Sequence, residues 1–198
     1  ANSSHSGAGA VTLDTGDLSI SAGAYNAAAG GTTTLTAGDL LVTGGTSTPD
    51  GAFVLNGADG DVGVSAGSIT FGGAVTTSGA GGGVSVGPAG TMTVNAALTV
   101  AEDLLVSGGT LDGTGQADVG GAMSVTGGTV NSSGAIDVGG GLSVAGGALG
   151  GTGDIDVEGA VQLSSGSFDG SARTIYAAGD WDETAAVFNS GAPPDTGM

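Results

Sequence analysis

Short runs along the chain alternate small hydrophobic residues with polar or small ones, and each run follows a glycine-rich phrase. In residues 121–125, Met123 and Val125 are apolar and Ser124 between them is polar. Because successive side chains of a strand face opposite sides, the run predicts a strand with Met123 and Val125 inward and Ser124 outward. Equivalent inward pairs are Leu18/Ile20, Leu40/Val42, Val62/Val64, Val84/Val86, Leu104/Val106, Leu142/Val144 and Val161/Leu163.

The glycine-rich phrase returns at a nearly constant interval. Its copies begin at residues 16, 38, 60, 82, 102, 121, 140, 159 and 179, so the step shortens from 22 residues to 19 and ends at 20. A period near 20 residues is the signature of a solenoid, in which each coil buries its apolar face by stacking on its neighbours. The sequence therefore predicts an all-β parallel β-helix, a triangular β-solenoid of about nine coils with 19–22 residues per coil.

Three strands per coil can be parsed from residues 121–139, with glycine corners between them because glycine reaches positive φ without a steric penalty. The second strand supplies inward residues such as Met92, Val130 and Phe168. The third strand is clearest at 136–138 and 155–157, where the outer residues face inward. Residues 46–50 in an early coil are predicted to be loop. A β-sandwich also has many short strands, but it does not predict a constant phrase at constant spacing.

The repeat sets the domain organisation. We expect an N-terminal extension at 1–10, a single solenoid domain at 11–190, and a C-terminal tail or the start of a further coil at 191–198, because the pattern stops in the middle of a coil there.

Charge is the most unusual feature of the composition. The chain has 19 acidic residues and one basic residue, Arg173, which gives a formal net charge of −18. A charge of that sign and size excludes nucleic acid as a partner. No stretch is long and apolar enough to cross a bilayer. The absence of cysteine and the abundance of Thr, Ser, Ala and Gly are typical of secreted bacterial surface proteins, so we expect an extracellular or cell-surface location.

Two sets of aspartates recur at equivalent positions. Asp118, Asp137 and Asp156 occupy one outward slot on three successive coils, so their carboxylates are predicted to stack about 5 Å apart. Such a column either solubilises the face or binds a cation, for which Ca²⁺ is the natural candidate. The second set stands at the corner before the first strand, where aspartate caps turns by bonding to backbone; its members are Asp17, Asp39, Asp61 and Asp103.

The inventory for catalysis is thin, and we expect no enzyme activity and no catalytic residues. The only histidine is His5, and Arg173 is expected to pair with Asp154 or Asp169. Thr-rich pieces such as 32–36 and 91–93 are not expected to hold one register from coil to coil.

Three aromatic side chains gather near the C-terminal coils. We expect Trp181, Tyr176 and Phe188 to cover the exposed end of the core or to serve assembly there, and stacking on a sugar is the alternative.

The phrase Gly-x-Leu-Ser-Val-x-Gly-Gly-x-Leu-x-x-x-Gly-x-Ile-x-Val, best seen in residues 121–170, resembles the repeats of filamentous haemagglutinins and related autotransporter-type bacterial adhesins. The segment at 178–188 is similar to a Gly-Asn-Trp phrase of those proteins, with Asp180 where Asn is usual. The resemblance implies stalks, fibres and adhesins whose repeats lack catalytic residues.

We therefore expect a structural component of an extracellular fibre, surface layer or adhesin stalk. It would be a rigid acidic rod continued head to tail by another copy, or by the rest of a larger surface protein. The alternatives are a glycan-binding or glycan-cleaving β-helix module, which would take a glycan or a host receptor as partner, and a calcium-stapled surface repeat.

Overall fold

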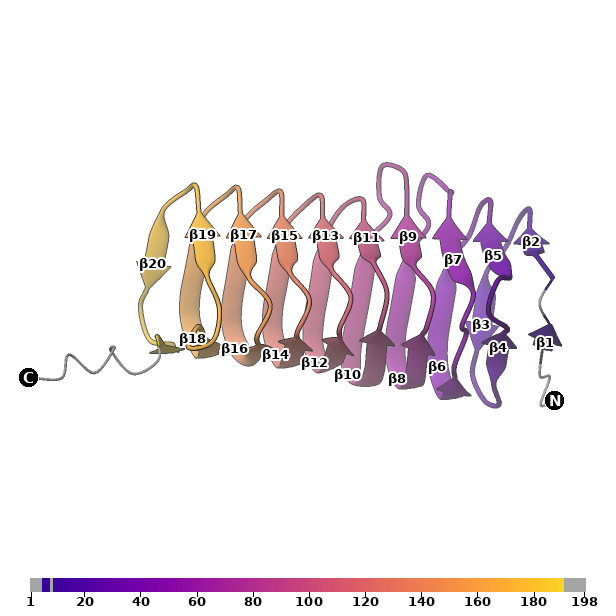
Figure 1. Ribbon diagram of the computed structural model, residues 1–198, viewed down its shortest axis with the longest axis horizontal. Helices are drawn as coiled ribbons and strands as arrows, with labels where there is room; N and C mark the ends of the chain where they lie inside the picture. Colours follow the sequence, from indigo (N-terminus) through magenta and orange to yellow (C-terminus); the bar gives the residue numbers. More distant parts are fainter. Residues whose placement is uncertain (1–4, 8, 191–198) are drawn as a thin grey trace, which may run out of the picture.

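The alternating runs form parallel strands that stack along one axis. The computed structural model describes residues 5–7 and 9–190, and it shows an all-β solenoid of about nine turns with no helix. Figure 1 shows the strands side by side along the long axis, with β1 and β20 at opposite ends. The predicted fold class is confirmed.

The coils contribute to two long sheets. The short-strand sheet holds nine strands of three or four residues: β2 (Val11–Leu13), β5 (Thr32–Leu35), β7 (Ala52–Leu55), β9 (Val75–Thr77), β11 (Leu98–Val100), β13 (Ala117–Val119), β15 (Ile136–Val138), β17 (Ile155–Val157) and β19 (Ile175–Ala177). The bent sheet holds ten: β3 (Leu18–Ile20), β6 (Leu40–Ser47), β8 (Val62–Phe71), β10 (Val84–Val94), β12 (Leu104–Gly113), β14 (Met123–Ser132), β16 (Leu142–Gly151), β18 (Val161–Asp169), β20 (Trp181–Glu183) and β21 (Val187–Asn189).

The first and second strands expected in each coil are joined into one bent strand in the central coils. β14, for example, runs without a break from Met123 through the Gly-Gly corner to Ser132. Pairing continues around the corner with register shifts, as between Val86 and Ala89 of β10, so a bulge replaces the expected loop. We call the part of each bent strand before the corner its first limb and the part after it its second limb.

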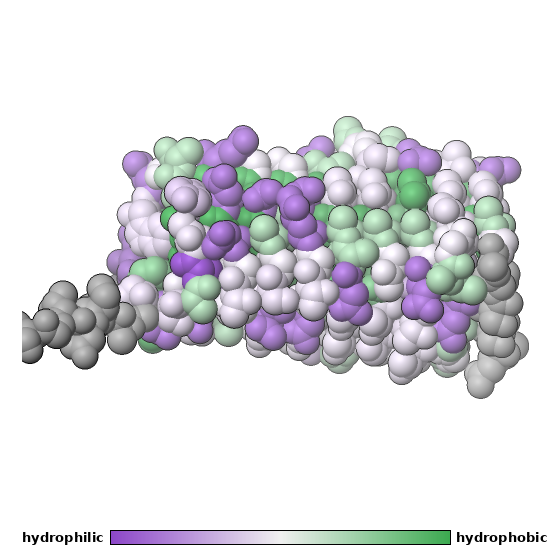
Figure 2. Space-filling model, viewed as in Figure 1, coloured by the Kyte–Doolittle hydropathy of each residue, from purple (hydrophilic) through white to green (hydrophobic). Residues whose placement is uncertain are grey.

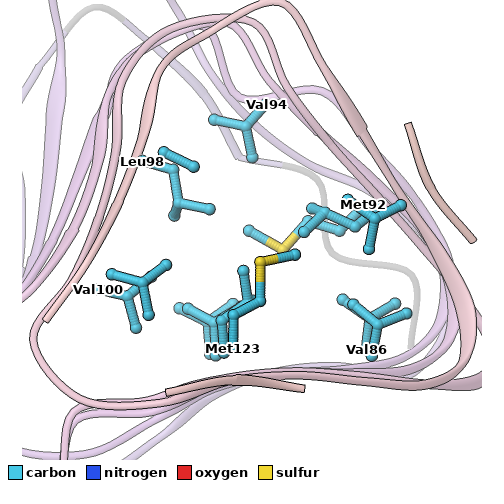
Figure 3. Packing of buried hydrophobic residues seen from close by; sticks show 14 of the residues in the cluster. Val86, Met92, Val94, Leu98, Val100 and Met123 are labelled. Atoms are coloured by element: carbon cyan, nitrogen blue, oxygen red, sulfur yellow. The ribbon is translucent and has the colours of Figure 1, made fainter. Parts of the chain in front are cut away.

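Three walls enclose one narrow apolar core. Figure 3 shows a roughly triangular cross-section in which Val86, Met92 and Leu98 point inward from the first limb, the second limb and the short-strand sheet, respectively. All three are at most 2% exposed. Inward residues of successive coils lie in register, as Met123 does with Leu142, so columns of apolar side chains extend through the stacked coils.

Two expectations about register are wrong. Thr46 and Ser47, expected in a loop, belong to β6 and pair with Ser68 and Ile69 of β8. Threonine also holds one register over part of the bent sheet, because Thr91, Thr110 and Thr129 are paired in succession. The additional residues of two early coils lie instead at 56–61 and 78–83, in the tall loops that follow β7 and β9 in Figure 1.

The paired strands begin before residue 11. β1 (His5–Gly7) pairs in parallel with β4 (Tyr25–Ala27), inside the segment expected to be an extension. The expected tail at 191–198 lies outside the described residues.

Candidate functional site

The acidic column formed by Asp118, Asp137 and Asp156 lies on the outer face of the short-strand sheet. The three residues pair in register on β13, β15 and β17, so their predicted stacking is confirmed. Thr99 precedes them and Tyr176 follows them in the same column. Figure 2 shows hydrophilic side chains gathered over these strands. A groove of about 520 Å³ runs along the column, and Glu158 also lines it.

An amide side chain ties two of the carboxylates together. Gln116 Nε2 donates to Asp118 Oδ1 at 2.7 Å and to Asp137 Oδ2 at 2.9 Å. Partial burial, together with the neighbouring Asp118 carboxylate, raises the pKa of Asp137 above its ordinary value. The column therefore stores electrostatic repulsion, which the Gln116 amide partly offsets.

The geometry does not add support for calcium. Within residues 5–7 and 9–190, no three His, Cys, Asp or Glu side chains are grouped so that they could hold a metal ion. Calcium requires several oxygen ligands that converge on one point, whereas a straight column presents its carboxylates side by side. The calcium site at Asp118, Asp137 and Asp156 stays a prediction.

The corner aspartates have a structural role. Each accepts a hydrogen bond from the main-chain N–H at the matching position of the next coil: Asp17 Oδ1 from Asp39 N at 3.0 Å, Asp39 Oδ1 from Asp61 N at 3.0 Å, Asp61 Oδ1 from Gly83 N at 2.8 Å, and Asp103 Oδ1 from Ala122 N at 2.7 Å. Bonding to backbone was predicted, but the bond joins successive coils rather than closing the turn of its own coil.

Two of the three C-terminal aromatic residues cover the core. The Trp181 ring stacks on Phe168 with centroids 6.1 Å apart, and the Phe188 ring meets Phe168 edge-on at 5.6 Å. Trp181 and Phe188 also contact each other at 5.3 Å. Tyr176 does not join them, because it stands in the outward column beyond Asp156 and is 62% exposed. End-covering by Tyr176 is therefore a wrong expectation, and its alternation within β19 is the signal that places it outside.

Arg173 does not make the predicted pair. Its three guanidinium nitrogens are buried without a hydrogen-bond partner. Asp154 Oδ1 instead accepts from Thr174 N at 2.7 Å, and Asp169 Oδ1 accepts from the Ser171 hydroxyl at 2.6 Å. Burial lowers the pKa of Arg173, and the hydrogen bonds from Ser171 lower that of Asp169.

The part of the chain that the structure describes contains no helix long and apolar enough to span a membrane. Comparison of the chain with family models of known proteins, with curated proteins and with solved structures found no match.

Proposed function

We propose that the chain is a rigid, acidic structural segment of an extracellular bacterial fibre, surface layer or adhesin stalk, continued end to end by the same or another chain. The supporting observation is the unbroken coil-to-coil register. Every step from β6 to β18 in the bent sheet joins parallel strands, and the short-strand sheet does the same from β2 to β19. Nine coils at about 4.8 Å per step give a rod on the order of 40 Å long.

The terminal strands supply the surface for continuation. Within the described residues, β19 pairs only with β17, and β20 and β21 pair only with β18. An unpaired strand edge is a template for a further strand. The phrase at 121–170 is the reason for proposing the haemagglutinin-like and autotransporter-like class of surface protein, and with it the extracellular location.

Electron microscopy of the purified chain over a range of concentrations tests continuation by further copies. Asp180 O accepts from β18 and Thr184 N donates to it, so the alternation of β20 points the N–H of Glu183 toward the unpaired edge. Glu183→Pro removes that N–H, and Glu183→Ala removes the same side chain but keeps it. We expect rods joined end to end in the wild type and in Glu183→Ala, and single short rods in Glu183→Pro. Single capped particles in all three at high concentration would contradict continuation by self-association.

A glycan-binding module is the second candidate, and one observation favours it. The exposed Tyr176 ring continues the column of Asp118, Asp137 and Asp156, so an aromatic face lies next to an acidic groove. Sugars bind where a ring can stack on them and carboxylates can accept their hydroxyl protons. Binding to a glycan array by the wild type and its loss in Tyr176→Ala are expected for this function. An array without signal contradicts it.

A further inference from the structure

The negative charge is confined to part of the circumference of the rod. Among the described residues, carboxylates lie on the short-strand sheet, at the corners that flank it, at the ends of second limbs, and in the last coil. The first limbs, the corner inside each bent strand, and the start of each second limb carry none from residue 19 to 48 and in the matching positions of every coil through 167.

We call this surface the uncharged face. It consists of three rows. The outward residues of the first limbs are Ser19, Leu41, Gly63, Ser85, Leu105, Ser124, Ser143 and Gln162. The corners are 43–45, 65–67, 87–90, 107–109, 126–128, 145–147 and 164–166. The second limbs begin with Thr46, Ser68, Thr91, Thr110, Thr129, Ala148 and Ser167.

We propose that the uncharged face is a lateral interface on which a second copy of this chain docks, so that two rods lie side by side. This pairing goes beyond end-to-end continuation and uses a different surface. Because one face is shared by both partners, the contact is self-complementary and closes at two copies.

Charge limits the orientations in which two copies can pair. Each copy carries a net charge of −18, and carboxylates within about 10 Å repel at ordinary salt. Contact through the short-strand sheet would oppose two acidic columns, and contact through its flanking corners would oppose two rows of Asp17, Asp39 and Asp61. When the uncharged faces meet, the carboxylates of both copies point away from the contact.

The shape and chemistry of the face also suit a protein partner. A shallow groove of about 430 Å³ lies between Leu41 and Leu105, where Gly63 and Ser85 leave space, and Leu105 is 38% exposed. The hydroxyls of Thr91, Thr110 and Thr129 have no hydrogen bond to any other described residue and can bond across the contact. Eight coils by two limbs give a face of roughly 40 by 20 Å, near the ~800 Å² per partner of a standard interface.

Two variants with matched charge test the proposal. Ser85→Asp with Leu105→Asp places two carboxylates at paired outward positions on the uncharged face. Thr76→Asp with Thr99→Asp places two at paired outward positions on the short-strand sheet. Both add the same negative charge, and circular dichroism and thermal melting confirm that each is folded.

Sedimentation equilibrium in about 0.15 M salt is the measurement. We expect twice the chain mass of 18.1 kDa for the wild type and for Thr76→Asp/Thr99→Asp, and the single-chain mass for Ser85→Asp/Leu105→Asp. The end-blocked Glu183→Pro variant should still pair, which separates this contact from end-to-end continuation. A wild type that remains single at millimolar concentration overturns the proposal, as does pairing that survives in Ser85→Asp/Leu105→Asp or is lost equally in both charge variants.

Discussion

At the scale of single residues, the corner aspartates act as clamps between coils. Asp39 Oδ1 accepts the Asp61 N–H, and the Asp39 N–H in turn donates to Asp17, so each carboxylate fixes the next coil above its own. Because the corner is partly open to water, losing one such bond should lower the free energy of unfolding by about 0.5–1 kcal/mol. We predict this loss for Asp39→Ala in urea denaturation. Asp59→Ala, which removes an exposed carboxylate without a hydrogen-bond partner, should leave the midpoint unchanged, and equal losses in both variants would rule out the clamp.

The acidic column should make stability depend on pH. Partial burial and Asp118 raise the pKa of Asp137 in the folded chain. Between the ordinary and the raised pKa the folded state therefore binds more protons than the unfolded state, so this group opposes folding above its folded pKa and ceases to do so as pH falls through it. We predict that Asp137→Asn melts at a higher temperature than the wild type at pH 7. The gap should narrow toward about pH 4, where the wild-type carboxyl is protonated. A gap that is the same at both pH values would show that charge is not its cause.

At the scale of elements, close contact between coils dictates glycine at the corner before the short-strand sheet. A Cβ on Gly134 would collide with the Gly115 carbonyl oxygen of the preceding coil, whereas a Cβ on Gly150 would come no nearer than 3.9 Å to other atoms. We predict that Gly134→Ala costs about 2–3 kcal/mol of stability and lowers the melting temperature by several degrees, because the two coils must move apart. Gly150→Ala should stay within about 0.5 kcal/mol. Similar melting temperatures for the two variants in calorimetry would show that the corner can relax.

The same corners explain what the sequence could and could not predict. Period-2 alternation identified the inward columns and the stacking of Asp118 on Asp137, because each limb keeps a strict register once it begins. The corners absorb insertions of varying length as bulges, so Thr46, Ser68 and Thr91 align although the phrase spacing does not match their own spacing. A count from the start of each phrase therefore misplaced the second limbs of the early coils and missed the threonine row. The unpaired guanidinium of Arg173 left no pattern in the sequence.

At the scale of the whole molecule, the rod is a one-dimensional stack. Each coil contacts only its neighbours, as the sequential pairing of both sheets shows. A central coil is therefore held on two sides and a terminal coil on one, so opening should begin at the ends and cost less there.

Trypsin can measure this difference, because the wild type has a single basic residue and it lies in the last complete coil. The buried Arg173 side chain must leave its site before cleavage, so the rate reports opening of that coil. Ser133→Arg places a second target at an exposed corner in the middle of the rod. We predict that native Ser133→Arg is cut at Arg173 at least about tenfold faster than at 133, and that both sites are cut at similar rates in denaturant, as followed by mass spectrometry. Cleavage at 133 that matches or precedes cleavage at Arg173 under native conditions would mean that the coils open together.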